Sequence, residues 1–176
     1  MFTWNPMGSG GLPLHRCNPL DILKATSPNF HADVAFIAEG LMPLSGSSSG
    51  HYFELRAREW IANLLKSRVE QFGGTSLPDL YRTINAIESD RQRWADQLEA
   101  MLGSAHESVR RTAAEMLTKQ QDTPKEFGSV LGEIYAHLNF LDDPVLLAAL
   151  ENPDFSLAMP TDRPQPVTVV PNVPAE

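Results

Sequence analysis

The sequence predicts an all-α fold, a multi-helix bundle of about six to seven helices with short extended segments at both ends. Prolines are the first reason: five lie in residues 1–43 and eight in 124–174, but only Pro78 lies between. Because a proline inside a helix removes a hydrogen bond and clashes with the preceding turn, the middle of the chain can form long helices. Apolar residues also recur there at three- and four-residue spacing, which is typical of amphipathic helices.

The chain begins with an irregular segment in which Met1–Trp4 is a candidate strand. A first helix is expected over about 32–42, and a Gly- and Ser-rich loop follows. The strongest helix signal covers 52–72, and Gly73-Gly74 ends it. The apolar stripe of that helix consists of Phe53, Ala57, Trp60, Ile61, Leu64, Leu65 and Phe72.

Good capping residues open the next two helices. Ser76 is a suitable N-cap, and Pro78 falls in the first turn after it. Ser89 or Asp90 can cap a helix that ends at a Gly-Ser pair, and a further helix is expected over about 105–120.

Two more helices are expected in the last third of the chain. Thr123-Pro124 with Glu126 has the pattern of a capping box and opens a helix that continues to Leu141. Asp143-Pro144 then begins a short helix, because aspartate caps well and proline suits the first helical position. Near the end, Val167–Val170 is a candidate strand.

These elements divide the chain into three parts. We expect an extended lead-in over 1–31, an all-α domain over 32–157 and a proline-rich return strand and tail over 158–176. Short helices are marginal in water when isolated, so the central part must pack as a bundle. Extended ends on a helical centre suggest an insertion into a protein that contains a sheet.

Charge and cysteine content exclude several classes. The net charge of −8 argues against a general polyanion binder, which needs lysines and arginines to displace the counterions of phosphates. Cys17 is the single cysteine, so neither an intramolecular disulfide nor a cysteine-based zinc cluster can form. The chain shows neither a signal-peptide pattern nor an apolar run long enough to cross a bilayer, so we expect it to be soluble.

No pattern of catalytic, cofactor-binding or metal-binding residues stands out. The glycine-rich stretch 8–11 lacks the Lys-Ser/Thr pair of a phosphate loop, and the histidines lack metal-ligand spacing. His15 and Cys17 could form a nucleophilic pair, but a lone thiol is usually structural. Trp60 and Trp94 lie on apolar helical faces and are expected in the core. We therefore expect no enzymatic activity and no cofactor in this chain.

Charge is distributed unevenly. Residues 52–120 contain ten acidic and ten basic residues, so an arginine-bearing face that contacts nucleic acid is only an alternative to ordinary ion pairing. Residues 122–176 carry two basic and nine acidic residues. The alternatives for this acidic end are a surface for a basic partner or simple helix capping and solubility. The candidate partner-binding residues are Glu126, Glu133, Asp142 and Asp143.

Several segments, taken in order, resemble one family. They are Asn18-Pro19-Leu20-Asp21, then Phe53 with Ala57-Arg58 and Leu64-Leu65, Ser129–Leu131, Leu138–Pro144, Asn152–Ser156 and the closing Val167–Pro171. The ordered set is similar to the type IV coupling proteins, the TraG/TraD-like ATPases of conjugation and type IV secretion. Its N-terminal family-motif residues are Asn18, Pro19, Leu20, Asp21, Phe53, Ala57 and Arg58.

The resemblance implies that this chain is the all-α domain, with flanking segments, of a parent α/β nucleotide-binding domain. ATP and Mg would belong to the parent, because the chain lacks the Walker A and Walker B motifs. The parent would be a membrane-anchored hexamer, with this domain on the cytoplasmic side of the bacterial inner membrane and without direct membrane contact.

The partners implied by the resemblance are secreted effector proteins, or a relaxase with its accessory proteins. Substrate recognition for the secretion channel is therefore the leading hypothesis for function. The alternatives are a DNA-contacting module of the same ATPase and an unrelated α-helical adaptor or small enzyme.

Overall fold

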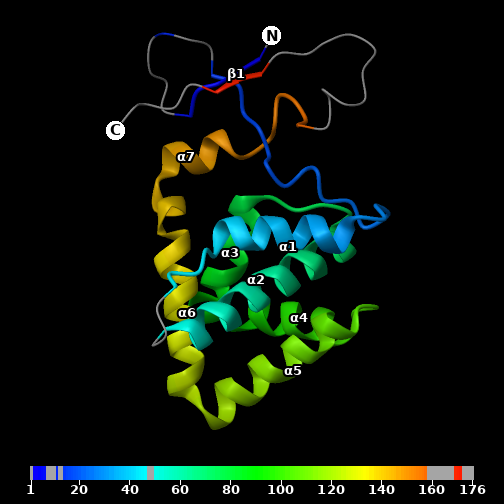
Figure 1. Cartoon of the computed structure of the whole chain (residues 1–176), viewed down its shortest axis with the longest axis vertical. Coiled ribbons are helices and arrows are strands. Elements are labelled where there is room, and N and C mark those ends of the chain that lie inside the picture. Colours follow the sequence, from blue (N-terminus) through cyan, green and yellow to red (C-terminus); the bar gives the residue numbers. More distant parts are fainter. Residues whose placement is uncertain (1, 7–10, 12–13, 47–49, 158–168, 172–176) are drawn as a thin grey trace.

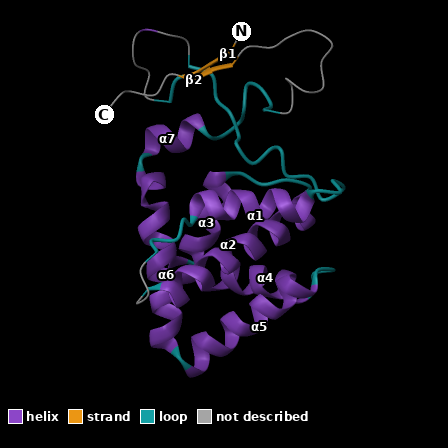
Figure 2. Ribbon diagram, viewed as in Figure 1, coloured by secondary structure: helices purple, strands orange, loops and turns teal. Residues whose placement is uncertain are grey.

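The computed structural model describes residues 2–6, 11, 14–46, 50–157 and 169–171. Helices dominate this part of the chain, which confirms the predicted all-α bundle (Figures 1 and 2). The elements are β1 (Phe2–Trp4), α1 (Phe30–Leu41), α2 (His51–Phe72), α3 (Leu77–Ser89), α4 (Arg91–Leu102), α5 (Glu107–Asp122), α6 (Pro124–Leu138), the 3₁₀ helix η2 (Asn139–Asp142), α7 (Pro144–Ala149) and β2 (Val169–Pro171).

Local sequence signals set several of the helix ends. The Ser76 hydroxyl accepts a hydrogen bond from the backbone N–H of Asp79 at 3.1 Å, so Ser76 caps α3 as expected. Asp90 caps α4 and Asp143 caps α7 in the same way. Gly73 ends α2 with φ of +73°, a left-handed conformation that glycine adopts without steric cost.

Two expectations about α6 were wrong. Thr123 makes no side-chain cap, because its ψ of 61° departs from the extended backbone that aims a capping side chain at the first turn. The helix expected to continue to Leu141 ends as an α-helix at Leu138 and tightens into η2. A 3₁₀ turn places residues three apart on one side, so Leu138 and Leu141 are both buried.

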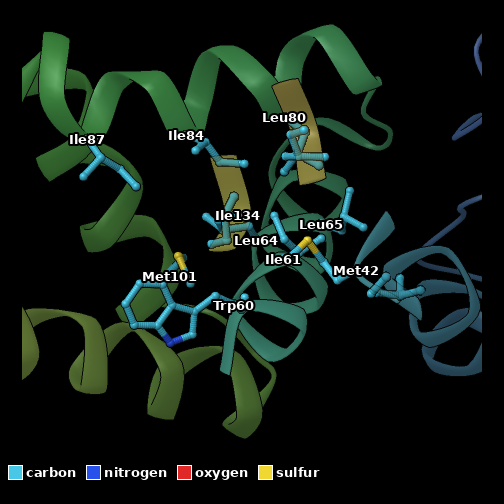
Figure 3. Close-up of a cluster of buried hydrophobic side chains, with 14 of the residues drawn as sticks. Met42, Trp60, Ile61, Leu64, Leu65, Leu80, Ile84, Ile87, Met101 and Ile134 are labelled. Atoms are coloured by element: carbon cyan, nitrogen blue, oxygen red, sulfur yellow. The ribbon is translucent and has the colours of Figure 1, made fainter. Parts of the chain in front are cut away.

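Helix α2 forms the centre of the bundle. It packs against α1, α4, α5 and α6, and the predicted stripe side chains Trp60, Ile61, Leu64 and Leu65 are completely buried (Figure 3). The Trp60 ring lies 5.3 Å from the ring of Phe127 on α6. The expected core positions of Trp60 and Trp94 are confirmed.

Polar side chains inside the bundle are hydrogen-bonded across helices. The Asn63 amide donates to the Thr112 hydroxyl at 2.8 Å, which joins α2 to α5. The Gln97 amide donates to the Ser67 hydroxyl at 3.1 Å, which joins α4 to α2. Buried polar groups are costly without partners, so these bonds favour one alignment of the three helices.

An ion pair fixes α3 against α2. The Arg68 guanidinium donates to both carboxylate oxygens of Asp79, at 2.8 and 2.6 Å. The same guanidinium lies 4.2 Å from the centre of the Phe72 ring. A two-point contact of this kind restricts both distance and angle, so α3 has little freedom to turn relative to α2.

The two candidate strands pair with each other. β1 and β2 run parallel, with Phe2 opposite Val169 and Trp4 opposite Pro171. They lie together at one end of the molecule, beyond α7 (Figures 1 and 2). Parallel strands need a long crossover connection, and here the whole helical bundle is that connection. Met1 of the first candidate strand, and Val167 and Thr168 of the second, fall outside the described residues.

Part of the expected lead-in contributes to the core. Leu20 and Leu23 are buried in the same cluster as the apolar residues of α1 and α2, and α1 itself begins at Phe30. Figure 1 shows this segment descending from β1 to the start of α1 alongside the helices.

The central position of α2 predicts that two leucines of this helix contribute very differently to the free energy of unfolding. Leu64 is completely buried, whereas 40% of Leu55 is exposed. We expect Leu64→Ala to lower the free energy of unfolding by about 2–5 kcal/mol, because it leaves a cavity in the core. Leu55→Ala should change it by only about 0.5 kcal/mol. Urea denaturation followed by circular dichroism measures both, and equal losses would contradict the arrangement.

Candidate functional site

The Asn18-Pro19-Leu20-Asp21 motif fastens the lead-in to the bundle. The Asn18 carboxamide accepts a hydrogen bond from the backbone N–H of Leu20 at 3.0 Å and donates one to the carbonyl of Thr75 at 2.8 Å. The first bond shapes a local turn, and the second holds that turn against the α2–α3 loop. Leu20 is thereby directed into the core, and Pro19 lies beside it at the surface.

The same motif also meets the chain as it leaves the bundle. The backbone N–H of Leu157 donates to the Asp21 carboxylate at 3.1 Å. Nearby, the backbone N–H of Arg16 donates to Asp154 at 2.7 Å, and the two side chains form an ion pair. The segments that enter and leave the helical region are therefore joined side by side.

The second part of the motif fixes α1. The Arg58 side chain on α2 donates through Nε to the carbonyl of Met42 at 2.9 Å, just after α1 ends, and lies 3.6 Å from Glu39. Ala57 is completely buried, and the half-buried ring of Phe53 lies edge-on to Tyr52. These contacts give the motif residues a structural role in positioning α1.

An apolar hollow lies where the motif meets α1, and we call it the α1 hollow. It has a volume of about 370 Å³. It is lined by Pro19, Leu20, Phe36, Ile37, Glu39, Gly40, Leu41 and Leu77. Phe36 is the most exposed of these apolar side chains, with 73% of its surface accessible. Large exposed aromatic side chains beside an apolar hollow are typical of protein-binding surfaces.

The α1 hollow also has room at its rim. A Cβ atom added to Gly40 would meet nothing within 4 Å, so the glycine leaves this side of the helix open. Glu39 supplies a carboxylate at the edge. The hollow is thus suited to receive an apolar side chain of another protein, with a polar or basic group next to it.

The α1 hollow was not predicted from the sequence, because α1 was expected only to be an amphipathic helix of the bundle. The buried face of α1 consists of Phe30, Val34 and Ala38, at four-residue spacing. Phe36 and Gly40 share that spacing but fall on another side of the helix. A phenylalanine, Phe36, placed off the buried face of a short helix was the signal that could have revealed it.

Glu126, a candidate partner-binding residue, is engaged inside the molecule. Its carboxylate accepts hydrogen bonds from the Lys119 ammonium and, at 2.5 Å, from the Tyr52 hydroxyl. The bond from Lys119, followed by that from Tyr52, holds the pKa of Glu126 below its usual value. The pKa of Lys119 is raised, because these bonds outweigh the desolvation that opposes them. This cluster joins α2, α5 and α6.

The other three acidic candidates lie apart from it. Asp142 accepts a hydrogen bond from the Tyr81 hydroxyl, which raises the pKa of that tyrosine. Asp143 caps α7 by accepting from the backbone N–H of Val145 at 2.8 Å. Glu133 is half-buried on α6. Asp143 therefore acts as a helix cap, whereas Glu126 and Asp142 bond to side chains of other helices.

Most arginines of the middle helices are also engaged. Arg56 pairs with Glu59 and Glu115, and Arg111 also pairs with Glu59 at 3.1 Å. Arg110 donates to two backbone carbonyls near the start of α5. Because acidic neighbours offset their positive charge, these arginines should attract phosphates only weakly.

The proposed thiol nucleophile has unsuitable surroundings. Burial, and then the charge of Asp21, raise the pKa of Cys17 to about 11, so the thiol is protonated near neutral pH. The backbone N–H of Thr3 donates to Nδ1 of His15 at 3.1 Å. Within the described part of the chain, no group of three or more His, Cys, Asp or Glu side chains is arranged to hold a metal ion.

The Glu126 cluster predicts a pH-dependent contribution to stability. Because the folded-state pKa of Glu126 is lowered, its stabilising effect is present above the unfolded value of about 4.5 and is lost as pH falls through the folded value. Glu126→Gln should therefore lower the urea midpoint at pH 7 but have little effect below the folded pKa. Glu133→Gln on the same helix is the control. If Glu126→Gln lowered the urea midpoint equally at pH 7 and at a pH below the folded pKa, the prediction would be contradicted.

Among the described residues, no helix is both long and apolar enough to cross a membrane. Comparisons with curated proteins and with solved structures found no significant match. The model of one protein family, type IV secretory system conjugative DNA transfer, matches residues 1–173. This match covers almost the whole chain, including the motif at Asn18–Asp21, the helical bundle and both strands. The chain belongs to the type IV secretory system conjugative DNA transfer family, as its resemblance to the coupling proteins predicted.

Proposed function

We propose that this chain is the substrate-recognition domain of a type IV coupling protein and recruits effector or relaxase cargo to the secretion channel. The α1 hollow is the observation that carries the proposal. It presents an exposed aromatic ring, an apolar floor and an open rim on one helix. Such a surface suits a protein partner, and the family assignment supplies the secretion context.

The strand pair supports the proposal that this chain is part of a larger protein. β1 and β2 are short, parallel and adjacent, and the helical bundle is the connection between them. A parallel pair of this kind is suited to extend a parallel sheet, so the bundle would be an insertion in an α/β nucleotide-binding domain. In this proposal ATP and Mg are bound by that parent domain, and the parent is a hexamer at the cytoplasmic side of the bacterial inner membrane.

The role of this chain in the proposal is binding without catalysis. Phe36 would act as an anchor whose ring is covered when cargo binds, while an apolar cargo side chain fills the α1 hollow. The motif contacts of Asn18 and Arg58 hold the walls of the hollow in place before binding. A surface that is already ordered loses little conformational entropy when it binds, which favours affinity.

The charges of the bundle favour this role over contact with DNA. Arg56, Arg68 and Arg111 are paired with carboxylates in the same molecule. A DNA-contacting module would neutralise phosphates with such arginines, and its affinity would fall steeply with salt. We expect no salt-sensitive DNA binding by this chain near physiological ionic strength, and fluorescence anisotropy with labelled DNA measures it.

The proposal predicts that two changes in the α1 hollow weaken cargo binding without unfolding the chain. Phe36→Ala removes the anchor, and Gly40→Leu fills the rim with a side chain that suits a helix better than glycine. Each should raise the Kd for a cognate effector or relaxase domain about tenfold or more, the usual effect of losing a binding hot spot. Isothermal titration calorimetry measures the Kd.

Phe140→Ala is the matched control, because Phe140 is also an exposed phenylalanine but lies in η2, outside the α1 hollow. It should leave the Kd unchanged. Unaltered binding by both Phe36→Ala and Gly40→Leu would exclude the α1 hollow as the cargo site. Absence of binding to every cargo protein of the same secretion system would reject the proposed function itself.

A further inference from the structure

A second apolar hollow lies on the seam between α1 and α2, and we call it the α2 hollow. Its volume is about 340 Å³, close to the 370 Å³ of the α1 hollow. It is lined by Ala35, Ala38, Leu55, Arg56, Arg58, Glu59 and Ala62. Three of these residues are alanines, whose short side chains leave the seam incompletely filled. None of them lines the α1 hollow.

The charged residues of the α2 hollow are paired within the chain. Arg56 lies 3.0 Å from the Glu59 carboxylate, and Arg58 lies 3.6 Å from the carboxylate of Glu39. Glu39 lines the α1 hollow, so the second ion pair joins the rims of the two hollows. Because its charges are already balanced, the α2 hollow favours an uncharged apolar group.

An exposed ridge of α1 separates the two hollows. Ala32, Phe36 and Gly40 follow one another at four-residue spacing and are all exposed. At 3.6 residues per turn, Ile37 falls on one side of this ridge and Ala35 on the other. Ile37 lines the α1 hollow and Ala35 lines the α2 hollow. Since α1 packs chiefly against α2, no helix of the described part of the chain covers this ridge (Figure 1).

A ridge with a hollow on each side is complementary in shape to another α-helix. Two helices pack by placing a ridge of one into a groove of the other. Side chains at positions i and i+7 of a helix are about 10 Å apart along its axis, roughly the width of a second helix. A partner helix that crosses α1 can therefore place one such side chain in each hollow, with Phe36 between them. In an extended segment, side chains on one face are about 7 or 14 Å apart, which fits this spacing less well.

The charge of α1 favours a partner with a basic residue over a second copy of this chain. Asp33 and Glu39 lie on α1, which contains no lysine or arginine. Asp33 takes part in no ion pair among the described residues, and it lies one turn before Ile37, on the side of the α1 hollow. Two antiparallel copies of α1 that crossed at Phe36 would bring Asp33 of one copy near Glu39 of the other. A lysine or arginine of a different protein would instead attract Asp33.

We propose that the cargo segment received at this surface is an amphipathic α-helix that crosses α1. One apolar side chain of the cargo helix fills the α1 hollow, and a second one, two turns further along, fills the α2 hollow. A lysine or arginine one turn from the first apolar side chain pairs with Asp33. This inference rests on the proposed function, to which it adds the second hollow and the class of cargo segment.

Three peptides of alanine, glutamine, leucine and lysine test the shape of the partner. The first is a helix-forming peptide with leucines at i and i+7 and a lysine one turn before the first leucine. The second has the same composition, with the leucines on opposite faces of the helix. The third is the first peptide with a proline midway between the leucines, which prevents a continuous helix. Each is titrated into the ¹⁵N-labelled chain, and the amide resonances of α1 and α2 are followed by NMR.

We expect the first peptide to shift the amide resonances of Ala35 and Gly40 with one common Kd, because these residues line different hollows. The other two peptides should bind at least tenfold more weakly. Equal binding of the first and third peptides would show that the surface takes an extended segment and would overturn the proposal. Shifts confined to one hollow, or no shift with any peptide in the millimolar range, would overturn it as well.

Ala35→Leu and Ala114→Leu form a matched pair of variants. Both alanines are exposed on helices, but only Ala35 lines the α2 hollow. Leucine suits a helix, so both variants should fold, and circular dichroism checks this. Because Ala35→Leu fills the α2 hollow, it should weaken binding of the first peptide at least tenfold, whereas Ala114→Leu should change it less than twofold. Equal effects of the two variants would reject the α2 hollow as a binding site.

Asp33→Asn tests the basic residue of the partner. It should weaken binding of the first peptide about threefold, the usual effect of losing an exposed ion pair, and it should leave a version with glutamine in place of lysine unchanged. Asp122→Asn on α5, at another exposed aspartate, is the control. An equal loss for the lysine and glutamine versions would reject the ion pair.

The Ala35→Leu variant also separates this inference from the proposed function. If a cognate cargo protein binds and depends on Phe36, but Ala35→Leu leaves its Kd unchanged, the α1 hollow remains the cargo site and the crossing helix is rejected. If no cargo protein of the same secretion system binds, the proposed function itself is rejected.

Discussion

The burial of α2 on several sides is the constraint on which the rest of the structure depends. Four helices pack around it, and its largest side chain, Trp60, is completely enclosed. A helix in this position buries polar as well as apolar side chains, and each polar one needs a partner. Asn63 and Ser67 find theirs on α5 and α4, so the neighbours of α2 are fixed in rotation as well as in distance.

The placement of α1 follows from this arrangement. Arg58 on α2 holds the end of α1 through the Met42 carbonyl, and Asn18 holds the preceding segment through Thr75. Residues of the family motif thus build the frame of the α1 hollow, and only Pro19 and Leu20 contribute to its lining. The exposed ring of Phe36 is presented on a helix whose position is fixed from two sides.

The tertiary fold gives many charged side chains intramolecular partners that the sequence alone does not reveal. The acidic end suggested a surface for a basic partner. In the fold, Glu126 accepts a hydrogen bond from Lys119 and Asp142 accepts one from Tyr81, while Asp143 caps α7. Arg56 and Arg111 on the middle helices are likewise paired with acidic side chains.

The sequence by itself determined the helical class, the start of most helices to within about two residues, and the family. Capping residues such as Ser76, terminators such as Gly73 and apolar spacing act within a few residues, so they can be read without the fold. The tightening of α6 at Leu138, the pairing of the two strands and the α1 hollow were decided only by tertiary structure. Each depends on residues far apart in the chain, whose contacts local spacing cannot specify.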